Sequence, residues 1–250
     1  MTVATVFDPP GLKTVFAGEH AWCGEKMKVT AALEGAVPLS QFFASGAFEA
    51  ALQRYGEAHP GGDRRAIVSM WSLYYFSALA IPFIVARRAE RLLPVSLGTM
   101  TIALAEDGLP RAFGLIDEGV WSDEGGEDLA RAVVPLLRGH LEPVVDRLKS
   151  RAGMAPKLAW NNVAVYLDYA FNATATTADA ETWPARPLFE ADRLADGGVN
   201  PFKGCLKRES DEMGPEPGRL VCRRKVCCLR YLLPGIPSCG ALCALPAQRH

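Results

Sequence analysis

The chain has 250 residues, of which 49% are hydrophobic and 22% are charged, and its formal net charge is -1 at pH 7. This composition is ordinary for a soluble globular protein and excludes a disordered or collagen-like chain. A net charge so close to zero gives no reason to expect nucleic acid as a partner.

The first ten residues, MTVATVFDPP, lack both the basic start and the long apolar run of a secretory signal. We therefore expect a cytoplasmic protein, in which glutathione and thioredoxin keep cysteines reduced. Residues 1–37 carry only short apolar runs broken by Pro and Gly, which predict irregular structure with a helix or short strands.

Two helices are expected next. Pro38 and a capping Ser40 start the first, and apolar residues at helical spacing continue it to Tyr55. The second begins near Asp63 and meets Pro82, which should kink or restart it.

Residues 66–86 form a run of 21 residues without a charge, long enough to span a bilayer. The run contains polar residues and a proline, arginines flank both ends, and no second such run exists. We therefore prefer a buried, Pro-interrupted helix pair, and leave open whether the run touches a membrane. Its aromatic residues are typical of a core and also of a ligand pocket; among them are Trp71, Tyr74 and Tyr75.

Between residues 95 and 115 the apolar period changes to two around a turn at Asp107-Gly108, which predicts a β-hairpin. An apolar stripe then predicts a helix from Leu129 that Gly139 breaks, followed by a second helix over Leu141–Lys149. A further helix is expected over Pro156–Asn172.

Residues 173–200 are rich in Ala, Thr, Asp, Pro and Gly, which is typical of a connector. The predicted fold class is therefore α+β: mainly helical, with a small β-hairpin and a C-terminal cysteine-rich segment. We divide the chain into a helical domain over residues 1–200 and a metal-binding segment over residues 201–250.

Five of the seven cysteines lie between residues 221 and 245. Four thiols in such a short segment can form two disulfides, bind one tetrahedral zinc ion or hold an iron–sulfur cluster. The odd number of cysteines and the expected reducing compartment disfavour disulfides. The four follow the pattern Cys-Cys, ten residues, Cys, three residues, Cys, at Cys227, Cys228, Cys239 and Cys243.

The adjacent cysteine pair helps to separate zinc from an iron–sulfur cluster. Successive side chains of an extended backbone diverge, so neighbouring thiolates converge poorly on one ion and reach a larger object more easily. The spacing therefore favours a two-iron cluster, with structural zinc as the alternative. Cys205 and Cys222 are expected to be free thiols, and Cys222 is a secondary candidate for a ligand.

Arg223, Arg224 and Arg230 surround the cysteine pair. Cations beside an anionic cluster favour its reduced state, and they also suit the docking of an acidic electron donor. A solvated basic strip explains the same pattern. The chain has no phosphate-binding loop, no dinucleotide fingerprint and no catalytic nucleophile pattern, so electrons must come from a separate donor.

The stretch RRKVCCLRYLLPGIPSCGALCALP resembles the C-terminal iron–sulfur segment of the FhuF-type ferric siderophore reductases. In that family a cysteine pair, ten residues and two further cysteines hold the cluster. Cys227, Cys228 and Cys239 match the first three positions, and Cys243 follows after three residues where the family usually leaves two. LAWNNVA, at residues 158–164, is similar to a tryptophan-asparagine helix start of the same family.

The resemblance implies a cytoplasmic reductase that passes one electron through a [2Fe-2S] cluster to Fe(III) held by a siderophore of the hydroxamate type. It implies Cys227, Cys228, Cys239 and Cys243 as cluster ligands. The three-residue spacing before Cys243 leaves open whether Cys222 takes the fourth position in its place. A peripheral association with the cytoplasmic face of the inner membrane is compatible with this role. The helical domain would supply the siderophore pocket, with Trp71, Tyr74, Tyr75, Trp160 and Asn161 as candidate lining residues.

Two other functions fit the same residues. A zinc-stabilised binding protein would use the four cysteines only for structure, and would be colourless. A general iron–sulfur electron-transfer protein would share the cluster but would have no need of a helical domain of this size.

Overall fold

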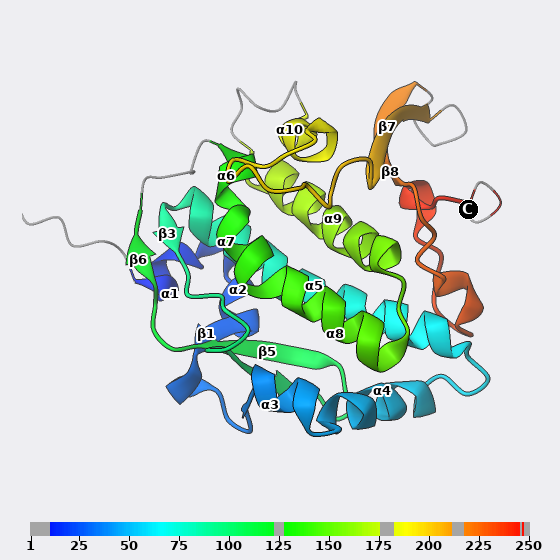
Figure 1. Cartoon of the computed structure of the whole chain (residues 1–250), viewed down its shortest axis with the longest axis horizontal. Coiled ribbons are helices and arrows are strands. Elements are labelled where there is room, and N and C mark those ends of the chain that lie inside the picture. The colour runs from blue at the N-terminus through cyan, green and yellow to red at the C-terminus, as the bar shows by residue number, and fades with distance from the viewer. Residues whose placement is uncertain (1–10, 123–127, 176–182, 212–217, 246, 248–250) are drawn as a thin grey trace, which may run out of the picture.

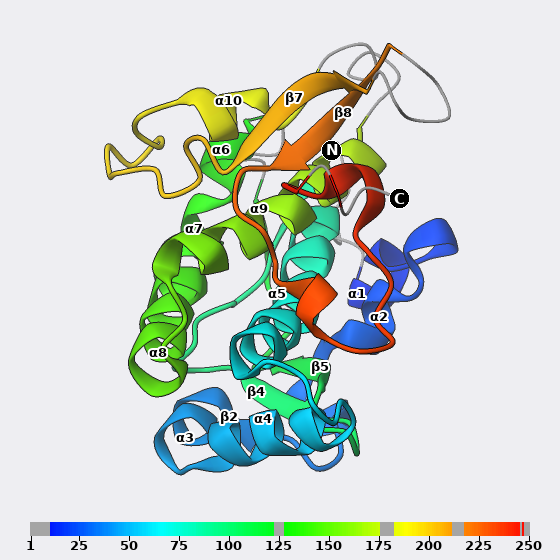
Figure 2. The same ribbon diagram turned by 90° about the vertical axis from the view of Figure 1, so that its right-hand side faces the viewer.

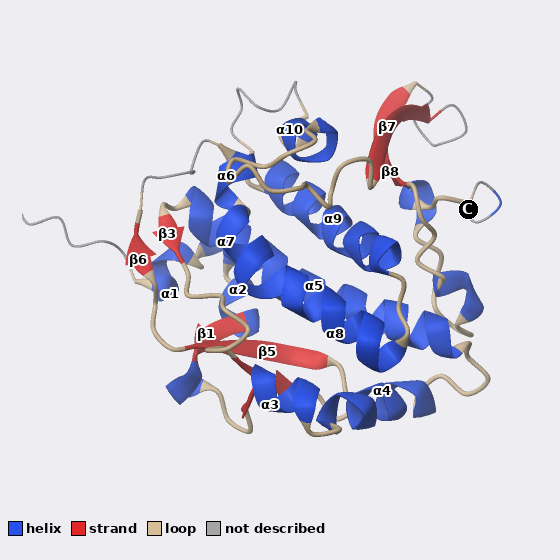
Figure 3. Ribbon diagram, in the orientation of Figure 1, coloured by secondary structure: helices blue, strands red, loops and turns tan. Residues whose placement is uncertain are grey.

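The computed structural model describes residues 11–122, 128–175, 183–211, 218–245 and 247. Helices dominate the described chain and the sheets are small, as Figure 3 shows. The α+β, mainly helical fold class is therefore confirmed.

Helix α5, Arg64–Arg88, runs through the middle of the molecule (Figure 1). It begins near Asp63, as predicted, and the Asp63 side chain caps it by accepting a hydrogen bond from the Arg65 backbone N–H (2.7 Å). Pro82 lies inside the helix, which neither ends nor restarts there, so the predicted helix pair is wrong. Because the helix is packed on all sides, burial offsets the roughly 3 kcal/mol that an interior proline costs.

The apolar run of the sequence is the buried part of α5. The helix is long and apolar enough to cross a membrane, but 89% of its most apolar 18-residue window is buried inside the molecule. Between Ala66 and Arg87, only Tyr74 and Ser77 are not buried. The core of this protein thus accounts for the hydrophobicity of α5.

Helix α9, Pro156–Ala173, packs along α5 and agrees with the predicted helix. Helix α8, Glu142–Ala152, packs against α9 in turn. The predicted break at Gly139 is wrong, because a π-helical turn, η3 (Leu137–Leu141), carries the helical path into α8. Two short helices precede this turn, α6 (Leu129–Ala132) and α7 (Val134–Leu136).

The main sheet has four strands in the order β1-β5-β4-β2. Strands β4 and β5 form the predicted antiparallel hairpin, and β1 pairs with β5 in parallel. The short strands β3 and β6 pair separately. The bounds are Met27–Val29 for β1, Val37–Pro38 for β2, Arg91–Leu92 for β3, Thr101–Leu104 for β4, Pro110–Leu115 for β5 and Val120–Trp121 for β6.

The helix predicted from Ser40 to Tyr55 is two helices, α3 (Leu39–Ala44) and α4 (Ala47–Glu57). Gly46 separates them with φ 81°, a left-handed conformation that glycine adopts without strain. Before them lie α1 (Leu12–Val15), η1 (Gly18–His20), α2 (Cys23–Lys26) and η2 (Thr30–Ala32).

The C-terminal part contains an unpredicted hairpin, β7 (Leu206–Asp211) with β8 (Arg219–Arg224). After β8 the chain descends in front of α5 and then returns toward β8, as Figure 2 shows. Its short helices are η4 (Arg230–Leu232) and η5 (Gly240–Leu242). Within the connector lies α10 (Arg186–Glu190), while residues 176–182 fall outside the described ranges. The domain boundary at residue 200 stays a prediction.

Candidate metal centre

The four cysteines of the motif lie on the irregular chain after β8. Cys227 and Cys228 precede η4, whereas Cys239 and Cys243 flank the two ends of η5. Leu229 has φ 63°, and its backbone N–H donates to Cys227 Sγ (3.3 Å). The chain therefore turns sharply just after the cysteine pair. This turn directs Cys227 and Cys228 toward the loop that carries Cys239 and Cys243.

Helices α5 and α9 hold the cysteine pair through one buried polar network. Ser69 Oγ of α5 donates to the Cys228 carbonyl (2.7 Å). Asn162 Nδ2 of α9 donates to Ser69 Oγ (3.1 Å) and to Ser72 Oγ (2.9 Å). Because buried polar groups are costly when unpaired, this network fixes the position of Cys228 relative to α5 and α9.

The neighbouring Asn161 fastens the same loop at a second point. Its Oδ1 accepts a hydrogen bond from the Val226 backbone N–H (3.1 Å), and its Nδ2 donates to the Lys157 carbonyl (3.0 Å). Asn161 and Asn162 of α9 thus both brace the cysteine loop. Asn161 was predicted as a pocket residue, and the structure instead gives it this bracing contact.

The four thiols lie near one another. Cys228 Sγ and Cys239 Sγ are 3.8 Å apart, and Cys228 and Cys243 are both buried. Cys227 interacts electrostatically with Cys228 and Cys243, and Cys239 forms a side-chain hydrogen bond with Cys243. Folding therefore brings the two halves of the motif together across the ten intervening residues.

The proton distribution between two of these thiols is uneven. The hydrogen bond from Cys239 lowers the pKa of Cys228, and the positive charges of Arg224 and Arg230 lower it further against the opposing effect of burial. The same hydrogen bond, together with burial, raises the pKa of Cys239. Cys228 is consequently the first of the pair to become a thiolate, the form that binds metals.

The three remaining cysteines lie apart from this group. Cys222, on β8, interacts with Asp168, and burial raises its pKa. Cys205 Sγ donates to the Pro201 carbonyl (3.4 Å), and Cys23 is fully buried in the core. The structure thus places Cys243, rather than Cys222, beside the other three members of the motif.

The donor set fits a metal centre in its chemistry. In the part of the chain that the structure describes, no three His, Cys, Asp or Glu side chains already have the arrangement of a metal site. However, two sulfurs bound to one tetrahedral metal at about 2.3 Å each lie about 3.8 Å apart, which is the distance between Cys228 and Cys239. This separation suits one iron of a [2Fe-2S] cluster and a zinc ion equally.

A cavity of about 570 Å³ opens beside the thiols. Helix α9 forms one wall, and the cysteine segment forms the other. Two cations, Arg224 and Arg230, face it together with apolar and aromatic side chains. The main lining residues are Leu73, Val165, Tyr166, Asp168, Tyr169, Cys228, Cys239 and Leu242.

None of the five predicted pocket residues lines this cavity. Trp71 and Tyr75 are fully buried in the aromatic core, where Trp71 Nε1 donates to the Gly108 carbonyl (2.9 Å). Tyr74 is 41% exposed and lies near Tyr55, and Trp160 packs edge-on against Phe202. The structure therefore does not bring these residues to this cavity, and their assignment to a siderophore pocket stays a prediction.

Two residues that do line the cavity share a sequence feature that links them. Tyr166 and Tyr169 are three positions apart on α9, and this spacing puts them on neighbouring parts of one helix face. The sequence alone did not reveal this role, because a helical stripe that borders a cavity has the same spacing as one that borders another helix.

The three arginines have different partners. Arg224, only 3% exposed, donates to Asn162 Oδ1 (2.6 Å), whereas Arg230 donates to the Ser238 carbonyl (3.4 Å). Arg223, 2% exposed, pairs with Glu209 (2.7 Å) and donates to the Ala241 carbonyl (2.7 Å) next to η5. A solvated basic strip is therefore excluded for Arg223 and Arg224, since both are buried.

Comparison with known proteins places these features in context. A family model described as "Ferric iron reductase FhuF-like transporter" matches residues 69–213, more than half of the chain. The match ends before the four-cysteine motif. The ferric siderophore reductase of Escherichia coli (strain K12) is 26% identical over 188 residues, which cover 71% of this chain and 65% of that protein. The aligned part thus spans less than two thirds of the relative's length.

Proposed function

Because the chain belongs to the FhuF-like ferric iron reductase family, we propose that it reduces ferric iron held by a siderophore. Ferric iron is a hard, highly charged ion that anionic oxygen ligands bind tightly. One-electron reduction lowers that charge and weakens the bonds, so Fe(II) can leave without any acid, base or nucleophile from the protein. The substrate that fits this chemistry best is a hydroxamate siderophore.

The observation that carries the proposal is the convergence of four thiols, two of which, Cys228 and Cys239, line a cavity. Cys227, Cys228, Cys239 and Cys243 would hold a [2Fe-2S] cluster, which supplies one-electron transfer chemistry when bound. The Ser69 hydrogen bond fixes the backbone of Cys228, and the bent backbone at Leu229 directs the pair toward the second loop.

The cavity is the proposed binding place of the ferric siderophore. Tyr169 is 55% exposed and offers an aromatic surface, and the buried Leu73 forms part of the inner wall. Arg224 and Arg230 supply positive charge that attracts the anionic oxygens of the chelate and stabilises negative charge at the thiolates. Substrate and thiolates would therefore meet on one wall without an intervening side-chain layer.

The electrons would come from a separate donor, a protein or a small reductant, in the cytoplasm. Peripheral association with the inner membrane stays compatible with this location. The exposed ends of the cysteine loops, including Tyr231 at 46% exposure, offer the donor a route to the centre.

The test is the visible spectrum and low-temperature EPR of protein purified without oxygen, before and after dithionite, with iron, sulfide and zinc assayed on one sample. We expect a red-brown protein with about two irons per chain and an EPR signal on reduction. The reduced protein should then convert a ferric hydroxamate siderophore to Fe(II). Colourless protein with one zinc after anaerobic reconstitution would establish the zinc-stabilised alternative instead.

Two matched variants test the ligand set. Cys243→Ser should lose most of the iron, because it removes a thiol beside Cys227 and Cys239. Cys222→Ser should keep the iron, because Cys222 contacts Asp168 instead. The opposite pair of results would make Cys222 the fourth ligand.

A further inference from the structure

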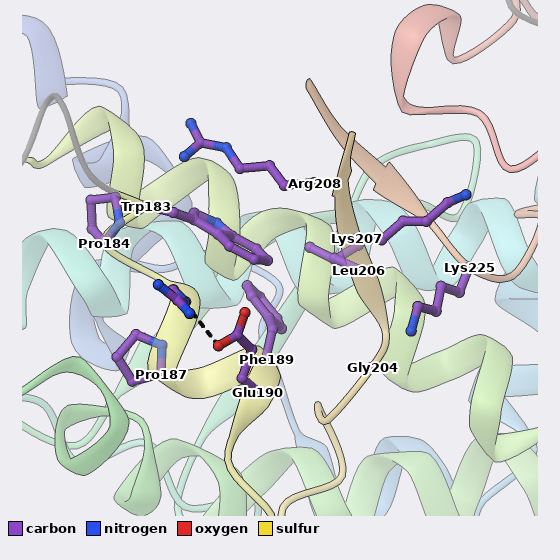
Figure 4. Close-up of a pocket in the computed structure, with 11 residues that line it drawn as sticks. Trp183, Pro184, Pro187, Phe189, Glu190, Gly204, Leu206, Lys207, Arg208 and Lys225 are labelled. Carbon is purple, nitrogen blue, oxygen red and sulfur yellow. Dashed lines mark hydrogen bonds and ion pairs between the residues drawn. The ribbon is translucent and has the colours of Figure 1, made fainter. Parts of the chain in front are cut away.

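A basic face lies around the start of β7 and the end of β8, next to the cysteine loop. At its centre is a second cavity, of about 900 Å³, between α10 and β7, and Figure 4 shows its lining. The charged side chains of the lining are mostly basic: Arg186, Lys207, Arg208 and Lys225, against the acidic Glu190. This surface is therefore hollow and positively charged, although the whole chain has a formal net charge of -1.

Ion pairs neutralise only part of this charge. Arg186 pairs with Glu190 (2.8 Å), and Lys207 pairs with Glu209 (2.6 Å). Lys225 is exposed and forms no ion pair with any residue in the described ranges. Positive charge that no neighbour offsets attracts groups of negative charge to this face.

Lys157, at the start of α9, adds a further exposed cation beside Lys225. Burial raises the pKa of the Cys205 thiol to about 11, and the positive charges of Lys157 and Lys225 oppose this rise. Both amines therefore lie near the same thiol. The backbone supports this placement, because Asn161, one turn after Lys157, accepts a hydrogen bond from the N–H of Val226, the residue after Lys225 (3.1 Å).

The basic face reaches the thiols without passing through the cavity proposed for the siderophore. Arg224 and Cys228 line that cavity, whereas Lys225 lines the second cavity and the half-buried Cys227 lines neither of the two. Successive side chains at the end of a strand point to opposite sides, so neighbouring residues can serve two surfaces. Because Lys225 is two residues from Cys227, their Cα atoms lie within about 7 Å of each other.

The arrangement of the cations selects the kind of partner. In Figure 4 the head groups of Lys207, Arg208 and Lys225 point to different sides, so they do not converge on one small anion. The same spread suits a protein surface that carries several carboxylates. A hollow face is also poorly matched to a flat bilayer, whereas a convex protein surface can enter it. Arg223 and Arg224 are buried and do not offer such a contact.

We propose that this basic face, centred on Lys157 and Lys225, docks an acidic electron-transfer protein that supplies the electron for reduction of siderophore-bound iron. The inference rests on the proposed function, because only a reductase needs an electron donor. In each turnover the donor protein is oxidised by one electron, and this electron reduces one Fe(III) to Fe(II) in the cavity beside the thiols.

The probe for the test is an acidic plant-type [2Fe-2S] ferredoxin that carries a fluorescent label. Fluorescence anisotropy measures its binding to the full-length protein, and the rate of Fe(II) release from a ferric hydroxamate siderophore measures electron transfer from reduced ferredoxin. Binding should weaken at least about tenfold when the salt concentration rises from about 50 mM to about 500 mM, because salt screens the charges that hold the two proteins together.

A charge-matched pair of double variants locates the docking face. Lys157→Glu/Lys225→Glu should weaken ferredoxin binding at least about tenfold and slow ferredoxin-driven Fe(II) release, while dithionite should still produce the EPR signal of the wild-type protein. Lys13→Glu/Arg111→Glu reverses the same number of charges at exposed positions on α1 and β5. This second variant should leave binding and Fe(II) release unchanged.

The outcomes separate this inference from the proposed function. If dithionite reduces the protein but ferredoxin does not bind, or if both double variants weaken binding alike, the docking face is refuted and the reductase function stands. Lysine-dependent binding to phosphatidylglycerol vesicles without ferredoxin binding would refute the protein partner and assign the face to a membrane. Lysine-dependent ferredoxin binding by a protein that dithionite cannot reduce would support the docking face and refute the reductase function.

Discussion

Asn162 is the residue at which α5, α9 and the cysteine segment meet. It is fully buried, its Nδ2 donates to Ser69 and Ser72, and its Oδ1 accepts from Arg224. The amide is suited to this position because it offers donors and an acceptor without a charge of its own. The neighbouring Asn161 holds the same loop by accepting from the Val226 backbone N–H, so the two consecutive asparagines fix the loop at two points.

Asn162→Ala should lower the free energy of unfolding by about 3 kcal/mol, because it leaves the buried Arg224 cation and two serine hydroxyls without this partner. Urea unfolding followed by circular dichroism measures the change. The variant should also retain less iron after reconstitution, since Ser69 loses the contact that positions it against Cys228.

The matched control is Asn172→Ala on the same helix. Asn172 is exposed and donates to the Asp168 carbonyl (2.7 Å), so its loss should cost less than about 1 kcal/mol. Equal losses in the two variants would mean that the buried network contributes little to stability.

At the scale of elements, the turn between β4 and β5 lies directly against α4. Gly108 has φ 84°, and a Cβ built there would lie 2.3 Å from the Ala51 carbonyl oxygen. The Gly108 carbonyl also accepts the hydrogen bond from Trp71 of α5. The glycine thus permits the sheet, α4 and α5 to approach one another closely.

Gly108→Ala should destabilise the protein by about 3 kcal/mol or more, because both a left-handed conformation and a clash with backbone atoms oppose the new methyl group. Gly46→Ala is the control, since Gly46 has φ 81° but no atom within 4 Å of a built Cβ. That change should cost only about 1 kcal/mol. Thermal unfolding of both variants compares them, and a similar loss in each would show that close packing at the turn is unimportant.

At the scale of the whole molecule, one buried histidine links α5 to the helical path before α8. His140 is fully buried, and burial lowers its pKa to about 3. Its Nδ1 donates to the Val95 carbonyl (3.1 Å), so its Nε2 is free to accept from the Tyr75 hydroxyl (2.6 Å). This arrangement holds only the neutral ring.

The neutral ring makes global stability depend on pH. Below the ordinary histidine pKa of 6.5 the unfolded chain binds a proton that the folded protein does not, so the free energy of unfolding falls with pH until the folded pKa is reached. From about pH 7 to about pH 5 this residue should account for a loss of about 2 kcal/mol. His140→Asn lacks the titrating ring, so urea unfolding should show a shallower decline. Parallel declines would argue against this assignment.

The sequence was most informative where a local pattern sufficed. The start of α5 near Asp63, the β4–β5 hairpin and the extent of α9 follow from helix-start signals and from apolar periods of two and 3.6 residues. It was misleading at Pro82 and Gly139, where the local preference to break a helix is outweighed by tertiary packing. The β7–β8 hairpin escaped prediction because its strands, LKRESD and RLVCRR, are dominated by charged residues whose alternation is not one of apolar and polar side chains.

By itself the sequence determined the set of four clustered thiols, the basic residues around them and the helical character of the rest, because these depend on composition and short-range spacing. Only the tertiary structure decided that Cys243 rather than Cys222 joins the other three, and that Asn161 and Asn162 brace their loop. It also decided that Tyr169 rather than Trp71 faces the cavity. The physical reason is that apolar and polar side chains on a helix have the same spacing whether they face a core, a loop or a cavity, and only the packing of α5, α9 and the C-terminal segment distinguishes these surroundings.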